Sequence, residues 1–216
     1  MTNNEGLMTD IYQGQFGEFT IDRGDRIGVI VYRSGLCVAA GSFIVGTGLL
    51  LFLGGTSTVL QILTPLFWLF SAGLAVSLLA IHIYLIPLHR LLQVFFLTGT
   101  LTAAILAWQT PEPLALAVYY RPITLLGIGF TFAALTGIYF KEAFCFNRLE
   151  TKLLTPLVPI LLLGHLVGIL PVGVERGLLA AWSLLFALFA IRKTIQPIPP
   201  DIGDKSVFAY LKKQGN

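Results

Sequence analysis

Three histidines are the residues of this chain that could bind a cofactor, because a neutral imidazole ligates haem iron, chlorophyll magnesium or a transition metal. They are His82, His89 and His165. His82 and His89 are seven residues apart, close to two helical turns, and would share one helix face only if that helix continued through Pro87. Gly164 and Gly168 flank His165 and would leave room beside its ring. We take His165 and His82 as the candidate cofactor-binding residues.

Nucleophilic chemistry finds less support. The two cysteines are Cys37 and Cys145, and Glu142 would lie beside Cys145 if the two residues share a helix. A catalytic thiolate needs a nearby base or cation, and no histidine is close in sequence. The chain also lacks a phosphate-binding glycine loop, HExxH and GxSxG. We therefore predict no catalytic residue, no metal site and no enzymatic activity.

Long apolar segments must position these side chains. Hydrophobic residues make up 56% of the 216 residues, and six stretches approach the roughly 20 residues that cross a bilayer as a helix. Because the stretches are apolar on all sides, they indicate helices and not barrel strands. The sequence predicts an all-α, polytopic transmembrane bundle with spans at 34–53, 59–85, 91–108, 122–140, 153–170 and 175–191.

The depth of each histidine in its span limits what it could bind. At about 1.5 Å per residue, His82 lies roughly 13 Å to one side of its span's centre, and His165 lies a few Å to the other side. The two residues cannot share one metal ion or one haem. Two interpretations of His165 remain, a single axial ligand to chlorophyll or a hydrogen bond to a neighbouring helix.

Basic residues are distributed unequally between the two sides of these spans. Twelve of the fourteen Lys and Arg residues fall on one side, and only Arg121 and Arg176 fall on the other. The positive-inside rule therefore predicts that both termini are cytoplasmic or stromal. Membrane insertion alone accounts for the net charge of +3, so no nucleic-acid partner is expected.

The chain divides into three predicted parts. Residues 1–33 form a cytoplasmic segment. In this segment YQGQFGEFTI alternates like a strand or hairpin, with an interfacial loop as the alternative, and residues 22–33 resemble an amphipathic lead-in helix. Residues 34–194 form the transmembrane domain, and residues 195–216 form a cytoplasmic tail. Arg176, Arg192 and Lys193 are expected to snorkel at the ends of the last span.

Two further patterns bear on function. Small residues recur four apart in several spans, which is typical of tight helix packing. The spans contain no acidic or basic residue at depth, so we expect no charge inside the bundle. Pro65, Pro156 and Pro159 interrupt two spans, as in transporters whose freed carbonyls line a binding site.

Several stretches resemble a known family. They are YQGQFGEFTI, the segment from Asp25 to Leu36, HIYLIPLHRLLQ, and GIYFKEAFCFNRLE followed by LLTPLVPILLLGHL. They are similar to an uncharacterised integral membrane family of cyanobacteria and plastids, domain of unknown function 2301, over about Tyr12 to Lys193. The resemblance implies a photosynthetic organism and a thylakoid location. The family has no established activity, so it supplies no functional residues.

The first functional hypothesis is accordingly a non-catalytic accessory or assembly protein of a photosynthetic membrane complex, in the thylakoid or plasma membrane of a cyanobacterium-like cell. Its partners would be the lipid bilayer and complex subunits such as those of a photosystem. The alternatives are a small-solute transporter or channel and a pigment- or haem-binding protein using one histidine. Chlorophyll or haem is the cofactor such a site would take, although we expect none.

Overall fold

A computed structural model describes residues 11–83, 85–207 and 210 and confirms the all-α bundle. Six helical segments in the described part are long and apolar enough to cross a membrane. They are α1 (Arg23–Leu53), α2 (Ser57–Ala80), α3 (Ile86–Gln109), α5 (Leu125–Phe146) with the preceding 3-10 turn η1 (Pro122–Thr124), α6 (Leu149–Leu166) and α7 (Val172–Ile195). The described part also contains two short helices, α4 (Leu114–Tyr120) and α8 (Pro199–Ile202).

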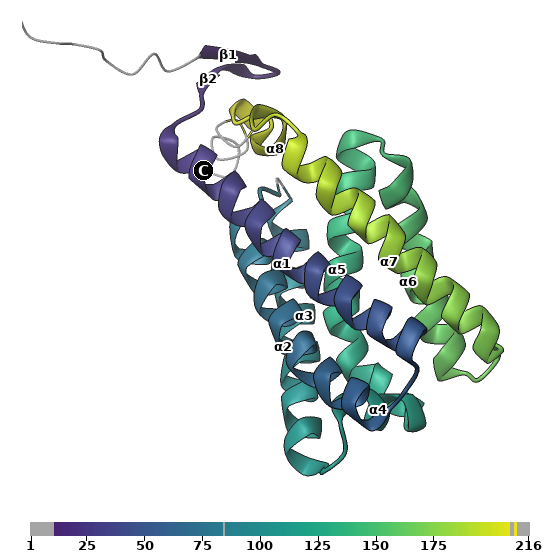
Figure 1. The fold of residues 1–216 in the computed structure, drawn as a ribbon. Coiled ribbons are helices and arrows are strands. Elements are labelled where there is room, and N and C mark those ends of the chain that lie inside the picture. The colour runs from purple at the N-terminus through teal and green to yellow at the C-terminus, as the bar shows by residue number, and fades with distance from the viewer. Residues whose placement is uncertain (1–10, 84, 208–209, 211–216) are drawn as a thin grey trace, which may run out of the picture.

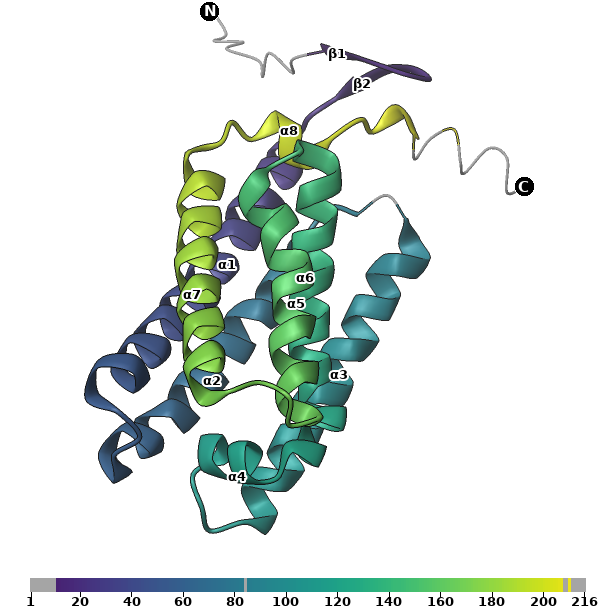
Figure 2. The ribbon, with the colours of Figure 1, turned by 90° about the vertical axis from the view of Figure 1, so that its right-hand side faces the viewer.

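Strands β1 (Ile11–Gly14) and β2 (Gly17–Thr20) form an antiparallel hairpin before α1. Figures 1 and 2 show this hairpin and α8 at the same end of the bundle, and α4 at the opposite end. We call these the terminal end and the distal end. An even number of spans requires the first and last described elements to share one end, as they do.

Helix α1 is longer than the first predicted span. Asp22 caps its start, accepting a hydrogen bond from the Asp25 N–H at 2.9 Å while the Asp25 carboxylate accepts one from the Asp22 N–H. This reciprocal capping satisfies backbone donors that a helix start otherwise leaves free. The helix then runs unbroken from the segment expected to lie along the membrane face into the bilayer-spanning region.

The second span is shorter than predicted. Helix α2 ends at Ala80, not at residue 85, and an extended residue, Ile81, follows it. Pro87 then stands in the first turn of α3, where its missing N–H removes no helical hydrogen bond. His82 therefore lies in a linker and His89 in α3, so the two do not share a helix face. By contrast, α2 and α6 continue past their internal prolines.

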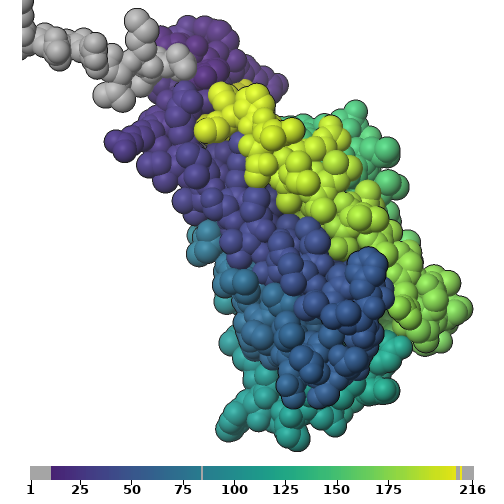
Figure 3. Space-filling model, viewed as in Figure 1, coloured from purple at the N-terminus to yellow at the C-terminus, as the bar shows by residue number. Residues whose placement is uncertain are grey.

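The helices pack side by side in the order α2, α1, α7, α6, α5 and α3. In Figure 3 the surfaces of α1 and α7 lie next to each other along one face of the molecule. The interior is rich in aromatic rings: Trp182 lies 4.5 Å from Phe43 and 5.4 Å from Phe132, between ring centroids, and donates a hydrogen bond to the Tyr139 hydroxyl at 3.2 Å.

Glycines bring α1 and α2 into backbone contact. A Cβ on Gly35 would lie 2.6 Å from the Gly73 carbonyl oxygen, and a Cβ on Gly73 would lie 2.6 Å from the Gly35 carbonyl oxygen. Ser77, one turn after Gly73, donates to the Tyr32 carbonyl at 2.9 Å. The small-residue pattern therefore serves packing inside the chain at this crossing.

The hairpin is held to the bundle through the segment after α8. The Asp204 carboxylate accepts hydrogen bonds from the Gln15 N–H at 2.6 Å and from Ser206, whose hydroxyl accepts one from the Phe16 N–H at 3.0 Å. The hydrogen bonds from Ser206 and Gln15 lower the pKa of Asp204 below its usual 3.8. The pKa of Asp204 is lowered only when the hairpin is docked. The Asp204 carboxylate therefore stabilises the docked hairpin above about pH 3.8, and this stabilisation is lost as the pH falls through the lowered pKa.

We therefore expect Asp204→Asn at neutral pH, or acidification of the parent protein, to release the hairpin turn. Hydrogen exchange at the Gln15 and Phe16 amides measures this release. The amides of α1 serve as the internal control, since they should keep their protection. Unchanged exchange at Gln15 in the variant would refute this docking.

Candidate functional site

The distal half of the bundle contains a cavity of about 580 Å³. Elements α1, α2, α4, α5, α6 and α7 all contribute to its walls, and Figure 2 shows α4 at this distal end of the bundle. The volume lies within the range of about 300–1,000 Å³ that is usual for small-molecule sites. Leucine and phenylalanine side chains form most of the lining, and Phe43, Phe70 and Phe132 lie at its deep side, next to Trp182.

His165 and Glu175 form the polar corner of this cavity. The end of α6 presents His165 and the first turn of α7 presents Glu175, and the histidine Nδ1 lies 2.6 Å from the glutamate Oε1. The other ring nitrogen, Nε2, lies 3.3 Å from the Tyr119 carbonyl oxygen, and the Tyr119 ring stacks on the imidazole at 5.0 Å. Both partners are acceptors, so the neutral imidazole can donate to only one of them.

This geometry bears on His165 as a pigment or haem ligand. Both of its nitrogens have partners, so a metal at Nε2 would have to replace the Tyr119 carbonyl. The flanking glycines also have other roles. Gly164 leaves the space into which the Leu170 side chain packs, and Gly168 has φ +69°, which makes the turn after α6. A ligand role for His165 therefore stays a prediction.

Arg176 is a further ionisable residue in the cavity wall, and it lies at the exposed distal mouth. Its guanidinium donates to the Leu51 carbonyl at 3.2 Å. Among the described residues no carboxylate lies within ion-pair distance of it, because the neighbouring Glu175 pairs with His165. The other distal arginine, Arg121, is outside the cavity wall and lies 3.6 Å from the Glu112 carboxylate.

His82 lies at the other end of the molecule. It occupies the linker between α2 and α3, half-buried, where its ring faces Gly28 of α1. Burial lowers the pKa of His82 below its usual 6.5, although the charge of Asp25 opposes this shift. No group of three or more metal-ligating side chains occurs among the described residues. His82 and His165 thus belong to separate regions, and the structure does not bring them together.

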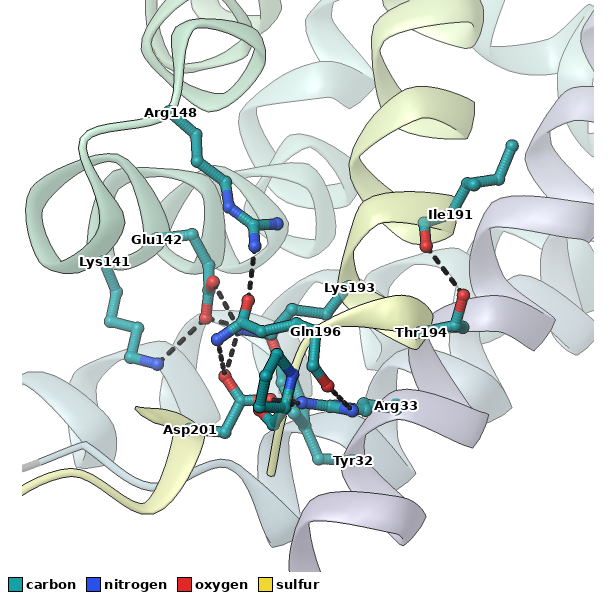
Figure 4. A network of polar contacts seen from close by, with 11 residues as sticks. Tyr32, Arg33, Lys141, Glu142, Arg148, Ile191, Lys193, Thr194, Gln196 and Asp201 are labelled. Atoms are coloured by element: carbon teal, nitrogen blue, oxygen red, sulfur yellow. Dashed lines mark hydrogen bonds and ion pairs between the residues drawn. The ribbon is translucent and has the colours of Figure 1, made fainter. Parts of the chain in front are cut away.

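The terminal end holds a buried cluster of charges (Figure 4). Lys193 of α7 is fully buried, and its Nζ lies 2.6 Å from Oε2 of Glu142 and also contacts Asp201. The second carboxylate oxygen of Glu142 accepts from Lys141 at 2.9 Å and from the Tyr32 hydroxyl at 3.2 Å. Glu142, also fully buried, therefore has a donor on each oxygen.

Asp201 of α8 extends this cluster to α1. Its Oδ2 accepts from Nε and Nη2 of Arg33 at 2.8 and 2.7 Å, and Arg33 also donates to the carbonyls of Gln196 and Pro197 at 2.7 and 2.9 Å. The two N–H groups of the planar guanidinium therefore converge on one carboxylate oxygen and make charge-assisted hydrogen bonds to it. The cluster links α1, α5, α7 and α8 at one point.

The expectation that no charge lies inside the bundle was therefore wrong. Lys193 does not extend its ammonium group to the membrane interface. Instead the ammonium pairs with the carboxylates of Glu142 from α5 and Asp201 from α8 inside the bundle. The sequence signal that was missed is the IPPDI segment after α7. Pro199 and Pro200 start a single helical turn, and this turn brings Asp201 back over the end of the bundle.

A second pair lies beside this cluster. Arg192 donates to the buried Glu150 at 2.9 Å, and Arg148 donates to the Gln196 side chain. One oxygen of Glu150 and one nitrogen of Arg148 are buried without a partner in the described structure. Three cations, Lys141, Arg148 and Lys193, lie within 5.5 Å of the Phe146 ring centroid.

A comparison with protein families gives a match. A family model described as an uncharacterized integral membrane protein, DUF2301, matches residues 76–210, which is more than half of the chain. The match includes α3 to α8, and with them His165, Glu175, Arg176 and most of the charge cluster. Searches of curated proteins and of solved structures found no match.

Proposed function

We propose that this chain, which belongs to the DUF2301 family of uncharacterised integral membrane proteins, holds a lipid-like molecule in its distal cavity as a non-catalytic accessory protein of a membrane complex. The cavity is the observation that carries the proposal. Its lining is apolar along most of its length, and its charged residues, Glu175 and Arg176, lie at the mouth with His165, a distribution that matches a molecule with an apolar body and a polar end.

We propose further that the complex is photosynthetic, in a thylakoid or in the plasma membrane of a cyanobacterium-like cell, and that both termini are cytoplasmic. The photosynthetic part is supported only by the resemblance of the sequence stretches described above. The orientation is supported by the excess of Lys and Arg on one side of the spans. Purification in a mild detergent, followed by identification of co-purifying subunits, tests the accessory role. Isolation of the chain alone from its native membrane would contradict it.

Occupancy of the cavity gives a direct prediction. Gly46 lines the cavity and Gly48, on the same helix, does not, so Gly46→Leu should fill the cavity while Gly48→Leu leaves it open. We expect the lipids extracted from purified Gly46→Leu to lack a species that both the parent and Gly48→Leu retain. Mass spectrometry of the extracts measures this loss. The same lipid content in all three proteins would overturn the cavity-binding proposal.

Small-solute transport is the second candidate function. One observation favours it: the cavity ends on aromatic rings, and beyond them the charge cluster closes the terminal end of the bundle. A site open at one end and sealed at the other is half of an alternating-access cycle. Reconstituted vesicles without substrate-dependent flux over a broad panel of solutes would remove this candidate. An absorption spectrum tests the pigment or haem alternative, which a colourless folded preparation would exclude.

A further inference from the structure

We infer that the occupant of the distal cavity is an amphiphile with a carboxylate head, of the long-chain fatty acid class, whose head lies against Arg176. The inference rests on the proposed function, because it assumes that the cavity is occupied. It goes further by naming the chemistry of both ends of the ligand.

The length of the cavity suits a hydrocarbon chain. Its wall follows α1 from Ser42 to the end of the helix at Leu53, a length of about 17 Å at 1.5 Å per residue. A cavity of this length suits an extended hydrocarbon chain.

The charges at the mouth indicate an anionic head. The Glu175 carboxylate lies 2.6 Å from Nδ1 of His165 and is therefore directed at the histidine and not at Arg176. Arg176 has only the Leu51 carbonyl as its partner among the described residues, so its guanidinium can take an anionic group. A guanidinium fork binds a carboxylate with two hydrogen bonds, which are the strong kind.

The start of α7 adds to this positive field. Arg176 stands in the second turn of this 24-residue helix, and Val172, its first residue, also lines the cavity. The capping residue is Pro171, and it provides no side-chain cap for the free backbone N–H groups at the helix start. An anion at the mouth would therefore meet the positive end of a helix dipole as well as Arg176.

Trp182 provides the readout. Its ring lies 4.5 Å from the ring of Phe43, which lines the deep side of the cavity, so a heavy atom near the end of a bound chain should quench its fluorescence. With Trp68 and Trp108 replaced by Phe, Trp182 is the only tryptophan left. The probes are stearic acid brominated near its methyl end and a neutral monoacylglycerol with the same brominated chain, each titrated into the full-length protein in nanodiscs. In the Gly46→Leu protein, whose cavity is filled, the remaining quenching measures the background from probe dissolved in the bilayer.

We expect saturable quenching by the brominated acid, with affinity about tenfold lower in Arg176→Gln because a charge-assisted hydrogen-bond pair is lost. Arg176→Lys should restore part of the affinity, and Arg121→Gln, the matched distal control, should leave it unchanged. Equal affinities for both probes and no effect of Arg176→Gln would overturn the carboxylate head while leaving the cavity function intact. No saturable quenching by either probe would overturn both.

Discussion

Lys193→Met is expected to destabilise the protein by about 3–5 kcal/mol, the usual cost of leaving buried charges without their partner. The Lys193 ammonium has donors directed at Glu142 and at Asp201, whose side chains are 0% and 2% exposed. Methionine keeps the length of the side chain but removes the charge. Two carboxylates would then repel each other in a site that excludes water. The midpoint of thermal unfolding in mild detergent, followed by circular dichroism, measures the effect.

Two variants control this prediction. Lys152→Met removes an exposed lysine of α6 and should change the midpoint little. The double variant Glu142→Gln/Lys193→Met should recover part of the loss, because Asp201 keeps Arg33 and a hydrogen bond from the Gln196 amide at 3.1 Å. If Lys193→Met unfolds like Lys152→Met, the buried cluster does not stabilise the bundle.

The second large effect is expected for Gly35→Leu, which should separate α1 from α2. A Cβ at this position meets the Gly73 carbonyl oxygen at 2.6 Å and the Ser77 backbone nitrogen at 2.8 Å. Backbone atoms cannot move aside as a flexible side chain can, so the helices must part and the hydrogen bond from Ser77 to the Tyr32 carbonyl is lost. We expect a loss of at least 1–3 kcal/mol, the usual cost of overpacking, and a fall in the yield of monodisperse protein.

Gly41→Leu is the matched control, since Gly41 lies on the same helix and a Cβ there meets no atom within 4 Å. It should give normal yield and a normal unfolding midpoint. A Gly35→Leu protein as stable as Gly41→Leu would show that α1 and α2 do not pack through their backbones. Because Gly35 is far along α1 from the cavity, which starts at Ser42, the comparison separates folding from ligand binding.

The charge cluster and the cavity occupy opposite ends of one bundle, and aromatic rings separate them. Tyr139 and Phe186 lie between the Trp182 level and the level of Glu142, with ring centroids 5.5 Å apart. This arrangement explains why the terminal end is sealed while the distal end is hollow. Lys193 variants should therefore change the stability of the protein more than its ligand binding. Arg176 variants should change ligand binding more than stability.

The sequence by itself determined the class of this protein and the number of spans, because the transfer of an apolar segment into a bilayer depends on local composition alone. The strand-like alternation of YQGQFGEFTI is equally local, and this segment folds as β1 and β2. The end of the second span was misplaced by five residues, since apolar Ile81, Ile83 and Leu85 extend the hydropathy signal past the helix itself. Hydropathy does not record where the backbone turns.

Only the tertiary structure decided the two sites. Glu142 and Lys193 are 51 residues apart, and Arg33 and Asp201 are 168 apart, so no spacing rule joins them. In the sequence each of these residues looked like a charge at a helix end. The desolvation cost of burying the charges is offset only because four elements supply partners at the same point. The same holds for Arg176, which has no carboxylate partner among the residues that the structure describes, because Glu175 pairs with His165 across the junction of α6 and α7. The chemistry of a side chain can be read from the sequence, but the packing of distant segments determines which groups it contacts.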